Sequence, residues 1–210
     1  SDVYKRQGIH STVRQVVCPR FFNPPIISFY PMTTLEQFDR VISRCRNMFA
    51  AKLGDYGPSW RILRPRSVTD QLYIKAKRIR TLEEGVAMVD EGTLGEFVAI
   101  VNYGIIGLIQ LALGYADSAD ITGDRALELY DANVKELRSL LAAKTHDYGD
   151  AWREMRVNSY TDFILTKLQR VKEIEDHAGH TSVSEGIASN YQDIINYAIF
   201  GVIKLTEPQS

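Results

Sequence analysis

Two stretches of the sequence carry polar residues with the types and spacing of a phosphate-binding site. The pattern Lys-x-x-Asp-Tyr-Gly-x-x-Trp-Arg occurs at residues 52–61 and again at 144–153, and a Lys-x-x-Arg pair follows each copy. Residues three apart share one face of a helix. Guanidinium groups hold phosphate through paired hydrogen bonds, ammonium groups add a point charge, and aromatic rings offer flat surfaces to a base. The candidate substrate-binding residues are Lys52, Asp55, Tyr56, Trp60, Arg61, Lys75 and Arg78, and in the second copy Lys144, Asp147, Tyr148, Trp152, Arg153, Lys167 and Arg170.

A structural use of the same residues stays open. Asp55 is placed to pair with Lys52 and Arg78, Trp60 suits a core, and Arg61 suits a helix cap. Two histidines, His177 and His180, are three apart, but no cysteine or third histidine is near them to complete a zinc site.

The last apolar stretch of the second copy suggests a metal site. Glu185, Asp193 and Asn196 fall within about 80° around a helix axis, and oxygen ligands of this kind suit Mg²⁺, which bridges to substrate phosphates. We therefore predict Glu185, Asp193 and Asn196 as ligands of Mg²⁺. A different use stays open here too, because Ser182-x-x-Glu185 is a capping-box pattern and Asp193 could be paired by Lys167 or Arg170.

The elements that position these residues come from a tandem duplication. The segment from residue 35 realigns with the segment from residue 127 at a shift of 92, which becomes 94 near residue 91. At the positions equivalent to the three predicted metal ligands, the first copy has Glu91, Ala99 and Asn102, so the central carboxylate is missing there. Two copies are too few for a solenoid, and a fused pseudo-dimer is the better interpretation.

The sequence predicts three helices in each copy. Apolar residues recur at helical spacing from residue 35 until Gly57 and Pro58 stop the first helix. Capping-box patterns at Ser67 and Ser159 predict the start of the second helix, which we expect to end near residue 82 in copy one and 176 in copy two. The third helices, at 94–113 and 187–205, are the most apolar. We predict an all-α helical bundle built from two tandem three-helix repeats, a pseudo-dimer about a twofold axis, with the third helices at its centre.

The length of residues 94–113 would suit a membrane span, but Glu96, Asn102 and Gln110 interrupt it, so we expect a buried central helix and no membrane partner. The chain has 25 basic and 26 acidic residues and two cysteines, which favour a soluble protein of a reducing, cytoplasmic compartment.

The first 31 residues differ from the rest in composition. They hold four basic residues and one acidic residue, show no helical period, and open like a translated sequencing adapter. We expect 1–31 to be a non-native or disordered leader, 32–118 the first repeat and 119–210 the second. Without the leader the chain has 21 basic and 25 acidic residues, a charge of −4, which disfavours nucleic acid as a partner.

The order of these motifs resembles the nucleotide modification associated domain, a family formerly classed among the domains of unknown function. The resemblance rests on Lys52…Asp55-Tyr56-Gly57, on its copy at residues 144–149, on the Lys-x-x-Arg pairs, and on the ending Asp-x-x-Asn-Tyr at residues 193–197. It covers 34–113 and 126–206. Phage members tend to carry two aspartates four apart before Asn-Tyr. Here Ser189 stands at the first of these positions, and copy one has Gly95 and Ala99.

The family looks like a distant relative of the helical nucleoside triphosphate pyrophosphohydrolases, which use carboxylates and Mg²⁺. The resemblance therefore implies a nucleotide-binding protein linked to nucleotide metabolism or modification, with Mg²⁺-dependent pyrophosphohydrolysis as the activity it points to. The alternative is a non-catalytic regulatory or protein-interaction module with an eroded site. The partners expected are a nucleotide or another phosphorylated small molecule, and a homo-oligomer is compatible with the sequence.

Overall fold

A computed structural model describes residues 32–88, 92–177 and 186–207. Within these ranges the chain forms six α-helices and two short 3₁₀ turns, and no strand. The all-α prediction is confirmed. The elements are α1 (Thr34–Tyr56), η1 (Ser59–Ile62), α2 (Pro65–Glu83), α3 (Thr93–Leu113), α4 (Gly123–Tyr148), η2 (Ala151–Glu154), α5 (Val157–Asp176) and α6 (Ile187–Thr206).

Local sequence explains where the first helix of each repeat begins and ends. Thr33 caps α1 by accepting from the backbone N–H of Glu36, whose carboxylate accepts the backbone N–H of Thr33 in return. The predicted stop at Gly57 is confirmed, and Gly149 ends α4 in the same way. Both glycines have a positive φ, 63° and 61°, which residues with a Cβ rarely adopt.

The N-caps predicted for the second helices, Ser67 and Ser159, are wrong by three residues. α2 begins at Pro65, and its N-cap is Arg64, which makes no side-chain capping bond. Ser67 therefore lies inside the first turn, and α5 likewise begins at Val157, before Ser159. Proline suits the first helical position because it lacks an N–H that would have no partner there, and its φ is already helical.

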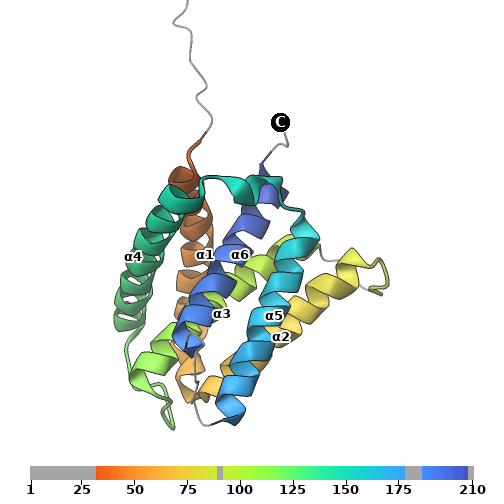
Figure 1. Ribbon diagram of the computed structural model, residues 1–210. Helices are drawn as coiled ribbons and strands as arrows, with labels where there is room; N and C mark the ends of the chain where they lie inside the picture. Colours follow the sequence, from red (N-terminus) through yellow and green to blue (C-terminus); the bar gives the residue numbers. More distant parts are fainter. Residues whose placement is uncertain (1–31, 89–91, 178–185, 208–210) are drawn as a thin grey trace, which may run out of the picture. The chain divides into compact units, whose positions relative to one another are not determined.

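The helices form three layers in the part that the structure describes. α3 and α6 pack against each other in the middle, α1 and α4 lie together on one side, and α2 and α5 on the other (Figure 1). The central position predicted for the third helices is confirmed. By length and composition α3 could cross a membrane, but 67% of its most apolar window is buried in the bundle. The absence of a membrane partner stays a prediction.

Contacts between the two repeats come in matched pairs. Across α1 and α4, Arg46 binds Asp131 with two hydrogen bonds of 2.7 and 2.8 Å, and Arg138 binds Asp39 with two of 2.8 and 2.9 Å. At a shift of 92, Arg46 corresponds to Arg138 and Asp39 to Asp131. Such reciprocity is the signature of a twofold interface.

The same reciprocity holds between α2 and α5. The Thr69 hydroxyl donates to Glu175 at 2.7 Å, and the equivalent Thr161 donates to Glu83 at 2.8 Å. Burial raises the pKa of both glutamates, and the threonine bonds only partly offset it. Two ion pairs complete the set, Arg80 with Asp162 and Lys172 with Asp70.

Glycines let the central helices approach closely. A Cβ on Gly107 of α3 would lie 2.4 Å from the ring of Tyr191 on α6, and a Cβ on Gly201 would lie 2.8 Å from the ring of Phe97. These two contacts are again equivalent, here at a shift of 94. The core of the bundle is therefore built about a pseudo-twofold axis, as predicted.

The boundary between repeats at 118/119 falls in the connection from α3 to α4. Nothing in the fold tests this division or the nature of residues 1–31, which lie outside the described residues. Both stay predictions.

Candidate functional site

Each repeat contains one pocket between its first helix, its 3₁₀ turn and its third helix. In the first repeat the pocket has a volume of about 440 Å³ and lies between α1, η1 and α3. Of the predicted site residues, Lys52, Tyr56 and Trp60 line it. The other lining residues are mostly apolar, and Met48, Tyr56 and Ile62 at its rim are about half exposed.

The pocket of the second repeat lies between α4, η2 and α6, with a volume of about 390 Å³. Lys144, Tyr148 and Trp152 line it, together with Asp193 and Asn196 from the predicted metal set. The two pockets are equivalent in position. Six lining residues are identical in both, namely Lys52/Lys144, Tyr56/Tyr148, Gly57/Gly149, Trp60/Trp152, Asn102/Asn196 and Tyr103/Tyr197.

Two lysines neutralise the carboxylate of the second pocket. Lys144 Nζ lies 2.6 Å from Asp193 Oδ1, and Lys167 Nζ lies 2.6 Å from Oδ2. Burial acts to raise the pKa of Asp193, but the two lysine bonds outweigh it and hold this pKa below its usual value. Asp193 is therefore ionised at neutral pH, and the pairing left open by the sequence, with Lys167, is present.

The first pocket lacks this carboxylate because Ala99 stands at the position of Asp193. Lys75, the equivalent of Lys167, lies 3.1 Å from Glu96 instead, one helical turn before Ala99, in an ion pair whose geometry makes no hydrogen bond. Within the described residues Lys52 makes no ion pair. The two halves therefore differ in one respect that matters for binding: Lys144 has an internal carboxylate and Lys52 has none.

The two arginines of the repeated motif, Arg61 and Arg153, do not line the pockets. Arg61 is 2% exposed, donates to Asp120 at 2.7 Å and to the Gly114 carbonyl at 2.6 Å, and also contacts Gln110. The bond from Arg61 lowers the pKa of Asp120. Arg61 therefore fixes the chain after α3 rather than binding a ligand.

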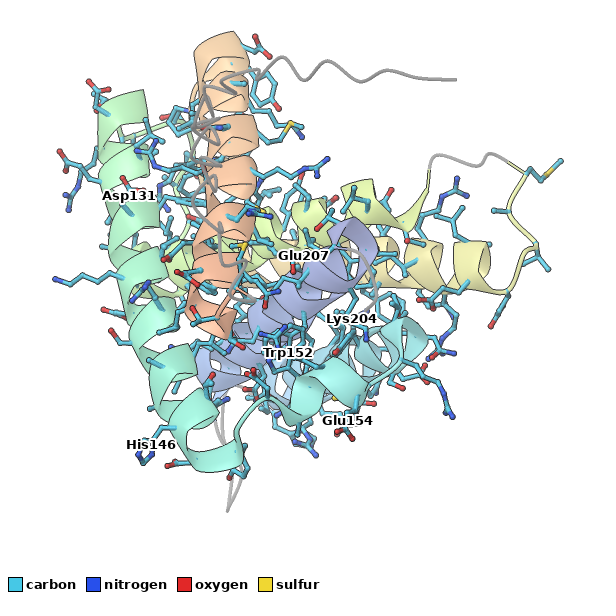
Figure 2. The ribbon with its side chains drawn as sticks, turned by 90° about the horizontal axis from the view of Figure 1, so that it is seen from above. Asp131, His146, Trp152, Glu154, Lys204 and Glu207 are labelled. Atoms are coloured by element: carbon cyan, nitrogen blue, oxygen red, sulfur yellow. The ribbon has the colours of Figure 1, made fainter. Side chains whose placement is uncertain are left out.

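Arg153 has the equivalent structural use. It donates to Asp150 at 2.9 Å and to the Thr34 hydroxyl at 3.1 Å, and its guanidinium lies 4.4 Å from the centre of the Trp152 ring. The Arg153 carbonyl accepts from Lys204 at 2.7 Å, and Figure 2 shows Lys204 near Trp152 beside the end of α6.

The tryptophans are buried, 8% and 7% exposed, so neither offers an open ring face to a base. Trp152 donates its indole N–H to Thr34 at 3.2 Å, whereas the equivalent N–H of Trp60 has no partner among the described residues. Eight of the fourteen predicted binding residues line neither pocket. Besides Arg61, Arg153, Lys75 and Lys167, these are Asp55, Arg78, Asp147, which pairs with His146, and Arg170, which lines a polar groove between α2 and α5. Figure 2 shows His146 at the outer end of α4.

The two equivalent asparagines differ in their partners. Asn102 donates to the Cys45 carbonyl at 3.1 Å and accepts from the Tyr130 hydroxyl at 2.9 Å. The equivalent of Tyr130 in the first repeat is Phe38, which has no hydroxyl to donate to Asn196. Both side-chain amide atoms of Asn196 are buried without a partner among the described residues. The asymmetry of the halves therefore extends from the lysines to the asparagines.

The described residues do not fit the predicted magnesium site. Both oxygens of Asp193 are bonded to ammonium groups, and a cation would have to displace them. Glu185 lies outside the described residues, as does Glu91 of the first repeat, and no group of three acidic, histidine or cysteine side chains with metal-site spacing occurs among the described residues. The metal stays a prediction, and no chemical step is derived from it here.

Sequence reasoning missed Arg44 and Tyr103, which also line the first pocket. The Asn-Tyr dipeptide is identical in both copies, and that identity was the signal for Tyr103 and Tyr197. Burial and the Asp193 charge raise the pKa of Tyr197. Burial also raises the pKa of Cys45 to about 12, so this thiol is a core residue and not a nucleophile.

The fold and the site define a duplicated six-helix protein with one small-molecule-sized pocket in each half. The family model described as nucleotide modification associated domain 1 matches the chain twice, at residues 52–111 and 144–205. The chain belongs to this family, and the tandem-copy prediction is confirmed. No curated protein and no solved structure matches the chain.

Proposed function

We propose that the protein binds a nucleotide in the pocket of its first half. The description of the family links it to nucleotide modification. The volume of about 440 Å³ is in the range of small-molecule sites, which are mostly apolar with a few placed polar groups. This proposal concerns binding and does not extend to hydrolysis, because Asp193, the central predicted magnesium ligand, is bonded to two lysines and Glu185 lies outside the described residues.

The observation that carries the proposal is the coincidence of retained residues with the pocket wall. Several hydrophobic positions of the wall differ between the copies, as in Phe49 and Leu141 or Ile106 and Phe200. Five of the six identical positions carry polar or aromatic side chains, those of Lys52, Tyr56, Trp60, Asn102 and Tyr103, and the sixth is Gly57. A wall kept only for packing would tolerate exchange at the lysine and the half-exposed tyrosine as well, since exposed residues contribute little to stability.

The chemistry of the wall suits a nucleotide. Lys52 and Arg44 supply positive charge for a phosphate, and neither makes an ion pair within the described residues. Tyr56 is 56% exposed and Tyr103 is partly buried, so their rings can contact a base without leaving the fold.

Isothermal titration with nucleoside monophosphates and triphosphates, with Mg²⁺ and with chelator, tests the proposal. Lys52→Met should weaken the affinity about tenfold or more, because one bond to a charged group is lost. Lys135→Met is the matched control, since Lys135 is an exposed lysine of α4 outside the pockets, and its affinity should stay within about twofold of the wild type. If no nucleotide binds, the alternative of a regulatory or interaction module is favoured. If Lys52→Met binds a nucleotide like the wild type, the nucleotide is not bound through Lys52 and the proposed pocket is wrong.

A further inference from the structure

Lys52 and Lys144 are equivalent lysines of the two halves, but their charged neighbours differ. In the second half the ammonium of Lys144 lies 2.6 Å from Asp193, whose side chain is 14% exposed. In the first half Lys52 lines the equivalent pocket, and a methyl group, that of Ala99, replaces the carboxylate. Two neighbouring residue types are the same in both pockets, Asn102 for Asn196 and Tyr103 for Tyr197.

From this contrast we infer that the first pocket contains a binding position for the anionic group of its ligand, next to Ala99 and Lys52. We call this position the seat. It is the place that the carboxylate of Asp193 takes in the second half. The second half thereby carries its own internal anion, and the first half takes the anion from the ligand. This inference rests on the proposed function and specifies where the phosphate, or a carboxylate of similar charge, is bound.

The charges around the seat support an anion. Arg44 and Lys52 line the pocket with positive charge, and the nearest acidic residue on α3, Glu96, is already paired with Lys75 at 3.1 Å. Ala99, which is partly buried, and Lys52, which is exposed, are both part of the pocket wall, so an anion between them would be partly shielded from water. Such shielding strengthens a bond to a lysine relative to one in water.

The room for the anion comes from the exchange of Asp193 for Ala99. An aspartate side chain is larger than a methyl group by one carboxylate, and in the second half that carboxylate fills space between Lys144 and Lys167. The first pocket, with Ala99 in its wall, has a volume of about 440 Å³. A carboxylate, or one face of a phosphate group, has the negative charge and the hydrogen-bond acceptors of the Asp193 carboxylate that is missing here.

Restoring the carboxylate tests the inference. Ala99→Asp should place an anion beside Lys52, and Ala99→Asn is the matched control, with nearly the same volume and no charge. Inorganic phosphate should raise the melting temperature of the full-length wild-type chain in a saturable way. Ala99→Asp should lose this response, whereas Ala99→Asn should keep a phosphate affinity within about threefold of the wild type. Without ligand, Ala99→Asp should also melt above Ala99→Asn at low salt.

Equal loss of phosphate binding in Ala99→Asp and Ala99→Asn would overturn the seat, because the loss would then come from volume and not charge. An Ala99→Asp variant that binds phosphate like the wild type would overturn it as well. Titration with nucleoside monophosphates and their nucleosides separates the two proposals. Nucleotide binding that is unchanged in Ala99→Asp leaves the proposed function and removes the seat. A phosphate response that Ala99→Asp abolishes, with no nucleotide binding tighter than phosphate, leaves the seat and removes the nucleotide. No response of the wild type to any of these probes overturns both.

Discussion

At the scale of single residues, a retained lysine does not imply a retained partner. Lys75 and Lys167 are equivalent, yet the first is paired with Glu96 and the second with Asp193. These two acidic positions are one helical turn apart in the alignment of the copies. The carboxylate has moved along the helix while the lysine has stayed, because either position lets a flexible lysine reach an anion.

The ion pairs of Asp193 predict a pH dependence of stability. The pKa of Asp193 is lowered in the folded chain, so its contribution is present at neutral pH and is lost as the pH falls through the folded pKa, below about 4. Asp193→Asn should lower the free energy of unfolding at pH 7 by about 1–3 kcal/mol, and the difference should shrink at pH 3. Urea denaturation at both pH values measures it.

Asp147→Asn is the control for this experiment, because Asp147 is exposed and contacts only His146 among charged groups of the described residues. Its effect should stay within about 0.5 kcal/mol at either pH. A difference between wild type and Asp193→Asn that is the same at pH 7 and pH 3 would contradict the assignment of the two lysine bonds.

The buried hydroxyl of Tyr130 gives a second prediction at this scale. Tyr130→Phe should lower the free energy of unfolding by about 1–2 kcal/mol, because the buried Asn102 oxygen loses its donor. Phe38→Tyr is the reciprocal variant, and we expect it to be tolerated better than an ordinary polar substitution in a core, since Asn196 has an unpartnered oxygen. Chemical denaturation of both variants checks this. Equal stability of Tyr130→Phe and the wild type would contradict a stabilising bond from Tyr130 to Asn102.

At the scale of helices, periodicity and glycines in the sequence were sufficient to place six helices in two repeats. The start of α2 was missed because Ser67 and Asp70 imitate a capping box, while Pro65 sets the boundary. The apolar period of α1 also includes Met48, which is 49% exposed at the rim of the pocket. A helix period shows which face is apolar, but it does not show where the facing helices stop covering it.

The site was predicted only in part for a related reason. Identity between the copies marks two different constraints, the pocket wall and the interface between the repeats. Lys52 and Tyr56 belong to the first, whereas Asp39, Arg46 and Thr69 belong to the second. Arg61 belongs to neither, because it holds Asp120 in a connecting segment whose sequence has no period to reveal it. Long-range pairing of this kind depends on tertiary structure.

The close approach of α3 and α6 predicts an intolerance to a single methyl group. Gly107→Ala should lower the free energy of unfolding by about 1–3 kcal/mol, because the buried ring of Tyr191 would have to shift. Gly95→Ala on the same helix is the control. Nothing lies within 4 Å of its added Cβ, so it should be neutral or stabilise by up to about 1 kcal/mol. Thermal or urea unfolding measures both, and a neutral Gly107→Ala would contradict the packing.

At the scale of the whole molecule, each repeat carries both partners of every matched contact. Asp39 and Arg46 belong to the first repeat, and each binds the twin of the other in the second repeat. Asp70 and Arg80 have the same relation, as do Thr69 and Glu83. A surface of this kind is complementary to its own copy.

A fragment of residues 32–118 should therefore form a homodimer. In isolation α3 would expose the face that α6 covers, and the dimer would cover it again, with Asp39 bound to Arg46 of the other copy. Light scattering after size exclusion should give twice the fragment mass, and Asp39→Arg should weaken the dimer, whereas Asp39→Arg with Arg46→Asp should restore it. A folded monomer, or an aggregate without defined size, would show that the repeats are not self-complementary.

The covalent link between the repeats has a consequence for how such a protein can change. In a dimer of identical chains, one mutation alters both sites at once, so neither can be modified while the other keeps working. After fusion each pocket accumulates substitutions alone. Ala99 and Asp193 occupy equivalent positions and illustrate this independence. One chain therefore contains a pocket without the carboxylate and an equivalent pocket that contains it. Selection can then act on their difference, which no symmetric ancestor could have offered it.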